Sequence, residues 1–506
     1  MDLETSNIAV PPRYRDSPLT LNGTFSSQKP DATANTTEIA ATAIYHMMQG
    51  FLATFPQYNP PDNSSLGVNL FAESYGGKYG PVFADVWEAE NERRQNGTTP
   101  PSSSVGIHLT SLGIVNGCVD DLVQGPYYPS MLVNNSYGIQ ALPPLQATLM
   151  NNSFYQPGGC RDLINRCRAA AAAGDPESRG TVASVNLACR SATNVCSRQL
   201  YEPYSNSGLS FYDIASSVPE SFPPRFYVEY LNTASVQTAV GVPINYTDLS
   251  RRVYVGFRDS GDFEREDVVP KLARLLRAGI RVGLMYGDRD YICNWLGGEA
   301  ISLAVAAAAG APYQVAFPAA GYAPIIVNDS YIGGAVRQFA NLSFSRVYQA
   351  GHFVPASQPE TAFQIFARIV LGTSVSTGAA VDLAVYNTSG PANATSSLKP
   401  PPQARPTCFV RALGDTCDLE QTASLAAGEG VVINGAWYAA SSDWAGARTT
   451  TPPTDTAGGS PTQTLTGLFT ATSTPNDAGG SLCRGRTWRA AVLGSLTVAG
   501  VLVAGM

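Results

Sequence analysis

The chain has 506 residues, of which 44% are hydrophobic and 14% are charged. That balance is typical of a globular protein with a substantial core and argues against disorder over most of the length. The formal net charge is −7 and no basic run is present, so we expect no nucleic-acid partner. The length allows one large α/β domain with insertions, or two to three average domains.

Cysteines and glycosylation sequons indicate an extracellular glycoprotein. Nine cysteines and eleven N-x-Ser/Thr sequons are spread along the chain, a combination typical of secreted proteins. The first thirty residues contain neither the basic nor the apolar part of a secretory signal, so either this assignment is wrong or the natural N-terminus differs. The acceptor residues are Asn22, Asn35, Asn63, Asn96, Asn134, Asn151, Asn245, Asn328, Asn341, Asn387 and Asn393.

The first part of the chain, residues 1–118, reads as an incomplete piece of an α/β core. Residues 1–36 are polar and are predicted to form a loop. Apolar residues at roughly helical spacing predict a helix over 37–55, which Pro56 ends. A later apolar run predicts a strand over 107–115.

Ser74 lies in the pattern of a nucleophile elbow. The apolar run 68–73 predicts a strand that ends at this serine, and a helix is predicted over 79–94. In such an elbow the sharp turn lifts the hydroxyl clear of a parallel sheet and leaves the next backbone N–H for an oxyanion. In this chain Ala72 replaces the first glycine of the usual Gly-x-Ser-x-Gly pattern, so the turn must accommodate a methyl group.

Residues 119–245 carry two pairs of cysteines with the same seven-residue spacing. If the pairs lie on an antiparallel helical hairpin joined through the alanine run 169–174, positions seven apart share one face. Only the nested pairing, Cys160–Cys196 with Cys167–Cys189, then keeps both bridges level. Four unrelated thiols would not predict equal spacings, so we interpret this region as a disulfide-stapled helical cap.

Residues 246–390 alternate short apolar runs with helical patterns, which favours a mainly parallel sheet. Helices are predicted over 266–278, 296–309 and 359–371, and strands over 280–286, 313–317, 324–327 and 344–347.

The C-terminal part is predicted to be a linker followed by an anchor signal. Thr, Ser, Pro and Gly dominate residues 391–475, within which Cys408 and Cys417 are expected to close a small loop. Residues 476–506 combine small residues, a short polar spacer and an apolar tail, the pattern of a GPI-attachment signal. The seventeen-residue tail is marginal for a spanning helix.

A serine nucleophile needs a base to take its proton and a carboxylate to orient that base. Three histidines are present. His46 lies in a predicted helix and His108 in a predicted strand, where we expect structural imidazoles. His352 follows a predicted strand next to Gly351 and is the candidate base.

Asp290 is the candidate acid, because it lies just past a strand end and 62 residues before His352. Ser74, Asp290 and His352 follow the chain order of α/β-hydrolases. Asp288 occupies the same turn and is the alternative acid.

Three segments around these residues resemble the signature blocks of the serine carboxypeptidases. They are Glu-Ser-Tyr-Gly-Gly-Lys-Tyr-Gly-Pro at 73–81, Gly-Asp-Arg-Asp-Tyr-Ile-Cys-Asn-Trp at 287–295 and Gly-His-Phe-Val-Pro-Ala-Ser-Gln-Pro-Glu at 351–360, and Asn-Gly at 116–117 is similar to a fourth block. The resemblance runs from about residue 10 to 372, and the layout is similar to the secreted, GPI-anchored fungal members. It implies an α/β-hydrolase fold and a serine exopeptidase that releases C-terminal residues at acid pH, with no metal or other cofactor.

The resemblance also implies roles for residues near the elbow. Asp290 rather than Asp288 matches the triad acid. Glu73 matches the glutamate that holds the terminal carboxylate of the substrate, and Tyr75 matches the residue whose backbone N–H enters the oxyanion hole.

Cys293 matches a free thiol near the substrate pocket of the family, and the cap cysteines match its nested disulfides. With Cys293 free and Cys483 in the tail, Cys118 is left without a partner.

In an α/β-hydrolase several strands and an oxyanion loop precede the nucleophile. Only 73 residues precede Ser74, and neither feature is found there. We therefore expect a carboxypeptidase that lacks its N-terminal strands and has an exposed sheet flank. The alternatives are a catalytically impaired cell-surface glycoprotein, or an esterase or acyltransferase on the same scaffold; the oligomeric state is left open.

Overall fold

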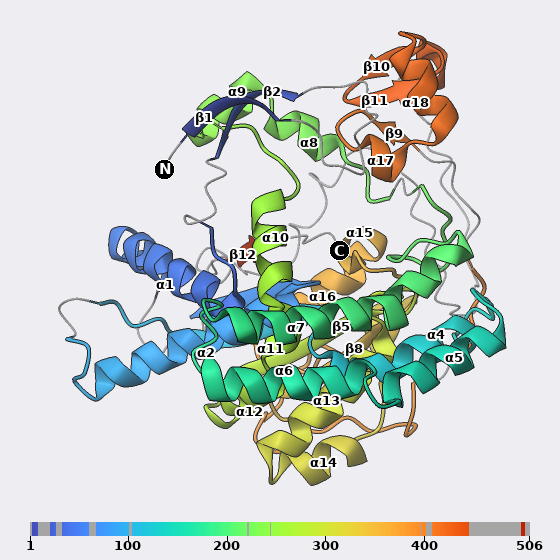
Figure 1. Cartoon of the computed structure of the whole chain (residues 1–506). Coiled ribbons are helices and arrows are strands. Elements are labelled where there is room, and N and C mark those ends of the chain that lie inside the picture. Colours follow the sequence, from blue (N-terminus) through green and yellow to red (C-terminus); the bar gives the residue numbers. More distant parts are fainter. Residues whose placement is uncertain are drawn as a thin grey trace.

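A seven-stranded sheet forms the centre of the protein (Figure 1). The computed structural model describes residues 3–8, 21–26, 33–59, 67–100, 104–219, 222–242, 244–394, 396–400, 407–444 and 497–500. In spatial order the strands are β12 (Thr497–Gly500), β3 (Val68–Glu73), β4 (Leu109–Val115), β5 (Arg281–Gly287), β8 (Leu342–Val347), β7 (Tyr331–Phe339) and β6 (Ala323–Asn328).

The sheet is mainly parallel. Neighbours from β12 to β8 run parallel, whereas β7 and β6 are added antiparallel. All seven residues of β5 are buried, as expected for a central parallel strand covered on both faces. This arrangement is the α/β-hydrolase fold predicted from the sequence.

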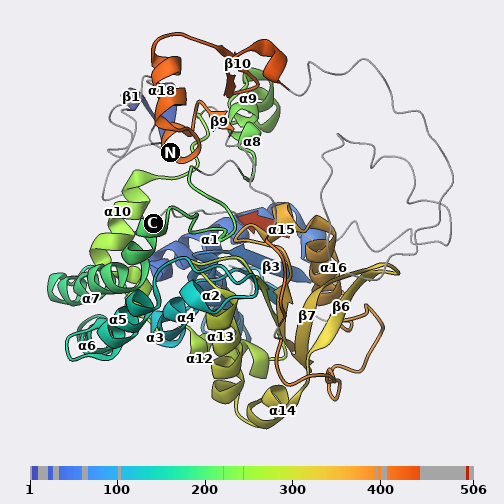
Figure 2. The same cartoon turned by 90° about the vertical axis from the view of Figure 1, so that its right-hand side faces the viewer.

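Two hydrophobic cores lie on opposite faces of the sheet. Leu284 of β5 packs in the larger core, whereas its neighbour Met285 packs in the smaller one, because successive side chains of a strand point to opposite faces. Figure 2 shows α16 on one side of the sheet and α2, α12 and α13 on the other. The core helices are α1 (Thr37–Thr54), α2 (Gly76–Gln95), α12 (Val269–Arg277), α13 (Trp295–Ala309), α14 (Tyr313–Ala319), α15 (Val354–Ser357) and α16 (Pro359–Val370).

The flank of β3 that we expected to be exposed is occupied by β12. Thr497 lies opposite Asn69, and four residues of each strand are in register. This strand falls within the predicted anchor signal 476–506, of which the other residues lie outside the described part of the chain. Within the described residues, no helix combines the length and apolar character needed to cross a bilayer.

The cap between β4 and β5 is helical, as predicted. Its two disulfides, Cys160–Cys196 and Cys167–Cys189, confirm the nested pairing. The alanine run 169–174 does not form the hairpin connection, because alanine has the highest helix propensity and the run continues α6. The helices that follow β4, up to α12, are α3 (Asp121–Gln124), α4 (Tyr128–Val133), α5 (Pro144–Tyr155), α6 (Cys160–Gly174), α7 (Ala183–Cys196), α8 (Phe226–Leu231), α9 (Ala234–Val240), α10 (Arg251–Ser260) and α11 (Asp262–Arg265).

Around the sheet edge, one strand prediction was wrong and one strand was missed. Residues 313–317 belong to α14, because a short apolar run does not distinguish a strand from a buried helix. Strand β7 was missed because Gly333 and Gly334 interrupt its pattern. Both glycines are required by packing, since a Cβ atom at Gly334 would lie 2.1 Å from the carbonyl oxygen of Arg346.

The polar N-terminal segment 1–36, predicted as loop, contains an antiparallel pair of strands. They are β1 (Leu3–Ile8) and β2 (Leu21–Ser26).

Residues 407–444 fold into a small unit, here called the C-terminal module, within the segment predicted as a linker. The predicted disulfide Cys408–Cys417 is present and packs with Leu413 and Trp437. Its elements are β9 (Cys408–Phe409), α17 (Leu413–Thr416), α18 (Leu419–Ala426), β10 (Val431–Ile433) and β11 (Ala436–Tyr438), with strand order β10–β11–β9.

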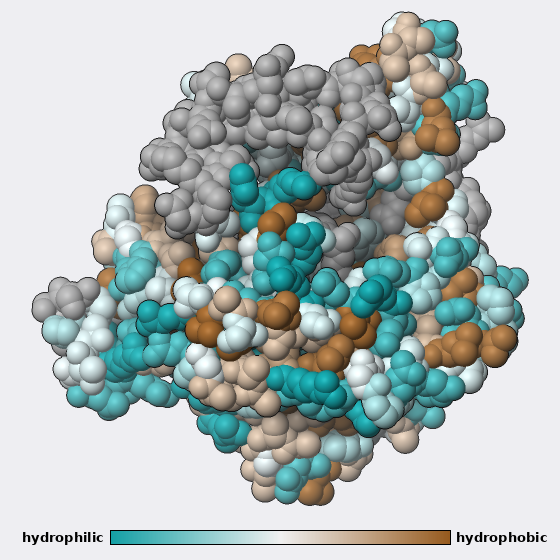
Figure 3. Space-filling model, in the orientation of Figure 1, coloured by the Kyte–Doolittle hydropathy of each residue, from teal (hydrophilic) through white to brown (hydrophobic). Residues whose placement is uncertain are grey.

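One face of the molecule is mixed in character. On the face shown in Figure 3, apolar residues are interspersed with hydrophilic ones. Exposed apolar side chains of this kind are ordinary on a globular protein and do not by themselves mark a site.

Candidate active site

Ser74 adopts a strained turn between β3 and α2. Its φ angle is +62°, which is uncommon for a residue other than glycine. The turn is fixed by backbone hydrogen bonds: the N–H of Ser74 donates to Val115, and its carbonyl accepts from Gly77 and Cys118, at 2.9 to 3.0 Å. Such strain persists only where the surrounding structure holds it, and it is common at active sites.

The small residues around Ser74 are required by close contacts. A Cβ atom at Gly76 would lie 2.6 Å from Cβ of Ala72, and one at Gly77 would lie 2.5 Å from the carbonyl oxygen of Cys118. The unusual alanine at the first position of the elbow is therefore accommodated because position 76 has no side chain.

Tyr75 is the N-cap residue of α2, a helix of 20 residues. Backbone N–H groups at a helix N-terminus have no carbonyl partner within the helix and carry a partial positive charge. The N–H of Tyr75 is thus placed where it can donate to an oxyanion formed at Ser74. Its side chain is anchored elsewhere, because the hydroxyl donates to Asp262 at 2.6 Å.

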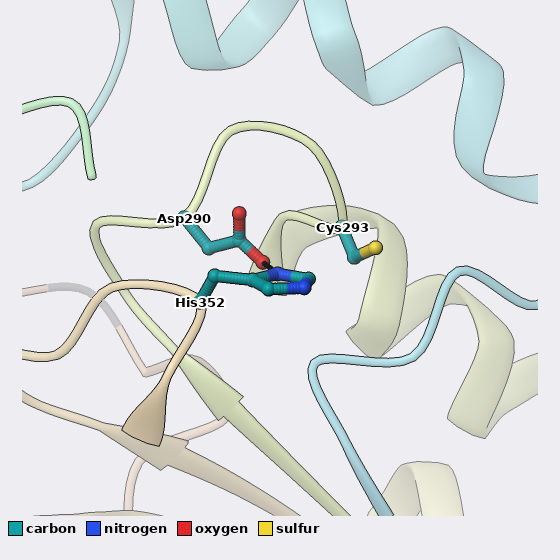
Figure 4. A group of neighbouring side chains, drawn as sticks. All are labelled: Asp290, Cys293 and His352. Carbon is teal, nitrogen blue, oxygen red and sulfur yellow. Dashed lines mark hydrogen bonds and ion pairs between the residues drawn. The ribbon is translucent and has the colours of Figure 1, made fainter. Parts of the chain in front are cut away.

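His352 and Asp290 form a buried pair at the ends of β8 and β5. Nδ1 of His352 lies 2.7 Å from Oδ2 of Asp290, and both side chains are buried (Figure 4). Asp290 also accepts from the backbone N–H of Ile292 at 3.1 Å, while the backbone N–H of His352 donates to Tyr212 at 2.7 Å. The carboxylate therefore fixes the imidazole ring and can stabilise its cation.

Asn116 is a site residue whose role was not predicted. Its side-chain amide donates to Oδ2 of Asp290 at 2.6 Å and accepts from the N–H of Gly287 at 3.0 Å. The signal in the sequence was its place in an Asn-Gly pair directly after a strand. A polar side chain at the carboxyl end of one parallel strand reaches the turn after the neighbouring strand.

Asp288, the alternative acid, has a different environment. It accepts from Tyr137 at 2.6 Å and from the backbone of Gln349 at 3.0 Å, and it pairs with Arg346 at 3.2 Å. The contact of Asp290 with His352 therefore favours Asp290 as the acid that orients the base.

Glu73 brings the elbow together with the His–Asp pair. Burial raises the pKa of its carboxyl to about 7, the nearby Asp290 contributes in the same direction, and His352 opposes the shift. This carboxyl also lines a cleft of about 1070 Å³. A carboxyl with this pKa is largely protonated in mildly acidic solution and can donate a hydrogen bond to an anion.

Cys293 is not a free thiol, which corrects the expectation from the sequence. It forms a disulfide with Cys118 across a Cα–Cα distance of 5.0 Å, within the usual range for a disulfide. The sulfur lies within 4.8 Å of ligand atoms of Asp290 and His352 (Figure 4). Because it is committed to the disulfide, the three groups do not form a thiolate metal site.

An elbow serine on a mainly parallel sheet, followed in the chain by a buried Asp–His pair, defines an α/β-hydrolase. The chain belongs to the serine carboxypeptidase family (Peptidase S10), whose model matches residues 14–372.

Fungal carboxypeptidases are among its relatives. Carboxypeptidase S1 homolog A of Arthroderma otae is 42% identical over 456 residues, covering 88% of this chain and 68% of the relative. Carboxypeptidase S1 homolog B of the same fungus is 44% identical over 422 residues, covering 81% and 63%. Carboxypeptidase S1 of Penicillium janthinellum is 31% identical over 358 residues, covering 71% and 77%.

The chain thus spans about two thirds of the length of the two Arthroderma relatives. Among solved structures, the prohormone-processing carboxypeptidase Kex1Δp of Saccharomyces cerevisiae matches with a TM-score of 0.47 and 18% identity, covering 67% of this chain and 68% of that one.

Proposed function

We propose that the protein is a serine carboxypeptidase that releases C-terminal amino acids from peptides through an acyl-enzyme. The observation that carries the proposal is the buried Asp290–His352 pair beside Glu73, the residue that precedes the elbow serine. The pair supplies the base for Ser74, and Glu73 supplies a protonated group for the substrate's free carboxylate.

The reaction follows from these placements. Oγ of Ser74 attacks the carbonyl carbon of the last peptide bond while His352 takes the hydroxyl proton and Asp290 stabilises the resulting imidazolium. The N–H of Tyr75 donates to the oxyanion. His352 then gives the proton to the leaving amine, and the C-terminal amino acid departs. Water, deprotonated by His352, attacks the ester and regenerates Ser74.

Glu73 favours exopeptidase over endopeptidase action and an acid pH optimum. Two ionised carboxylates in a shielded pocket repel each other, so the substrate carboxylate binds well only while Glu73 holds a proton. Because its pKa is about 7, Glu73 loses this proton as the pH rises above neutrality. The affinity of the enzyme for the substrate carboxylate then falls.

The proposal is tested by leucine release from N-benzyloxycarbonyl-Phe-Leu, with Ser74→Ala as the inactive control. The same dipeptide with a C-terminal amide lacks the carboxylate and is expected to react far more slowly. Hydrolysis of an N-acyl-Phe ester without leucine release would instead support an esterase. A folded protein that does not react with a fluorophosphonate probe would support a catalytically impaired glycoprotein.

An extracellular location is also part of the proposal. Four disulfides support an oxidising environment. Nine of the eleven sequon asparagines lie in segments whose side chains are described, and each is exposed or half-buried: Asn35, Asn96, Asn134, Asn151, Asn245, Asn328, Asn341, Asn387 and Asn393. Asn22 and Asn63 fall outside those segments. We infer an extracellular glycoprotein held at the cell surface by a GPI anchor, whose attachment would remove the apolar tail and β12 with it.

Two measurements check this inference. Treatment with an N-glycosidase should lower the apparent mass of the protein expressed in a fungal host. Phosphatidylinositol-specific phospholipase C should release it from the cell surface, and protein that stays with the cells after this treatment would contradict the GPI anchor.

A further inference from the structure

The C-terminal module is seated on the cap by three contacts around α8. Arg411 of the module pairs with Glu229 at 2.5 Å, and the rings of Phe409 and Phe226 pack edge to face with centroids 5.0 Å apart. Arg225 lies between Asp248 of the cap at 2.9 Å and Asp415 of the module at 3.8 Å. These contacts fix the orientation of the module.

The seated module forms one wall of the cleft that contains Glu73. It contributes Gly414, Asp415, Cys417, Asp418 and Leu419 to the lining. Figures 1 and 2 both show the module next to α8 and away from the central sheet. Glu73 and the module thus line the same cleft, so a peptide whose carboxyl terminus lies at Glu73 can extend along this wall.

The cleft is acidic. Its lining includes the carboxyls of Glu73, Glu202, Asp248, Asp415 and Asp418, and Arg225 is the only basic residue among the described lining residues.

Arg225 is engaged by Asp248 and Asp415. Of the remaining carboxyls, Glu202 accepts from Ser197 at 3.4 Å, and Asp418 accepts from the backbone of Gln421 at 2.7 Å. The ion pairs found in the described part of the chain give neither of them a cationic partner.

We propose that the C-terminal module makes the outer part of this cleft a binding site for cationic side chains of the substrate, with Asp418 as its determinant. The site acts on residues upstream of those that flank the cleaved bond, because each residue extends a peptide by about 3.4 Å and the module lies beyond the inner wall. Glu202 of the cap supplies a second carboxylate to the same cleft. This inference rests on the proposed carboxypeptidase function.

The first test uses acetylated hexapeptides that end in Phe-Leu. A single lysine is placed at the third, fourth, fifth or sixth residue, counting the C-terminal leucine as the first, and the other positions are alanine. Leucine release is measured at about pH 5.5, where ordinary aspartates are ionised. For at least one lysine position, we expect kcat/KM to exceed that of the all-alanine peptide by about two- to fivefold, the range of exposed ion pairs.

The variant Asp418→Asn removes the charge but keeps a side chain that caps α18 well. We expect the lysine-to-alanine ratio of kcat/KM to fall to about one. Glu420→Gln is the matched control, because Glu420 is an exposed residue in the same helical turn that does not line the cleft; it should keep the ratio. Equal loss in both variants would overturn the assignment of Asp418.

A second test concerns the seating of the module. Arg411→Glu places two carboxylates at its contact with Glu229 and should lower the lysine preference, and adding Glu229→Arg should restore it. If the lysine preference survives in Arg411→Glu, or is not restored in the double variant, the seated module does not form the wall that binds the lysine.

Failure of this inference differs from failure of the proposed function. If the wild-type chain releases leucine from the all-alanine peptide but shows no lysine preference, only the inference is wrong. If it releases leucine from none of the peptides, the carboxypeptidase proposal fails with it.

Discussion

Oδ2 of Asp290 lies 2.7 Å from Nδ1 of His352 and 2.6 Å from Nδ2 of Asn116. One carboxylate oxygen thus joins the candidate base to a side chain from the neighbouring strand. This oxygen fixes the tautomer of His352 in which Nε2 can accept a proton. Asn116 fixes the carboxylate in turn.

The first prediction concerns Asp290→Asn. The amide has nearly the same shape but favours the wrong imidazole tautomer, so kcat is expected to fall about 10⁴-fold with little change in KM. Leucine release, normalised to folded protein, measures the loss.

Asp288→Asn is its control. It leaves the buried guanidinium of Arg346 without its ionised partner and should lower the free energy of unfolding by about 3–5 kcal/mol. The folded fraction should keep most of its kcat. A 10⁴-fold loss in Asp288→Asn, with Asp290→Asn active, would reverse the assignment of the acid.

The second prediction concerns Asn116→Gly. Asn116 has a φ angle of +40°, which glycine adopts without strain, so the variant removes the side-chain hydrogen bonds and spares the turn. Loss of a bond to a charged group costs about 1.5–3 kcal/mol, and we expect kcat to fall about tenfold or more at unchanged KM. A variant with wild-type kcat would show that Asn116 does not position Asp290.

The triad candidates could be found from the sequence because each follows an apolar run and sits in a long, distinctive block. Chain order then linked Ser74, Asp290 and His352. The role of Asn116, directly after β4, could not be predicted, because strand order in the sheet brings it to Asp290 across 174 residues of chain. The Cys118–Cys293 disulfide has the same limit, since its cysteines are 175 residues apart and no repeated spacing links them.

The C-terminal module was hidden for a different reason. Its strands have two or three residues each, too few to show a period of two. Its core depends on a disulfide and on a few apolar residues such as Leu413 and Trp437. A composition dominated by Thr, Ser, Pro and Gly on either side made the whole segment resemble a linker.

The third prediction is the pH dependence set by Glu73. Because its pKa is about 7, the carboxyl is protonated below that pH and ionised above it. The kcat/KM of the wild type should therefore fall above about pH 7. The glutamine in Glu73→Gln cannot ionise. The kcat/KM of this variant should therefore stay constant between about pH 7 and 8.5, because its KM does not rise with pH. A maximum above about pH 8 in the wild type would contradict the role of Glu73.

The fourth prediction is the number of free thiols. The four disulfides use eight of the nine cysteines. Titration of the unfolded, unreduced chain with its C-terminal tail intact should therefore find one thiol, that of Cys483, which lies outside the described residues. A chain processed at a GPI-attachment site upstream of Cys483 should have none. Three thiols would instead indicate that Cys118 and Cys293 are unpaired.

The fifth prediction concerns the two small residues that pack behind the nucleophile. A methyl group introduced by Gly76→Ala would lie 2.6 Å from Cβ of Ala72, so either β3 or α2 must shift. Overpacking of this kind costs about 1–3 kcal/mol, and displacement of the elbow should lower the rate of fluorophosphonate labelling at Ser74 by about 10- to 100-fold.

The double variant Ala72→Gly/Gly76→Ala removes the opposing methyl group and should recover most of the labelling rate, whereas Ala72→Gly alone should change it little. The rescue separates the clash from a general loss of helix or strand stability, because both single changes persist in the double variant. If Gly76→Ala labelled as fast as the wild type, the elbow would have room for both methyl groups. The absence of a side chain at position 76 would then not explain how alanine is tolerated at position 72.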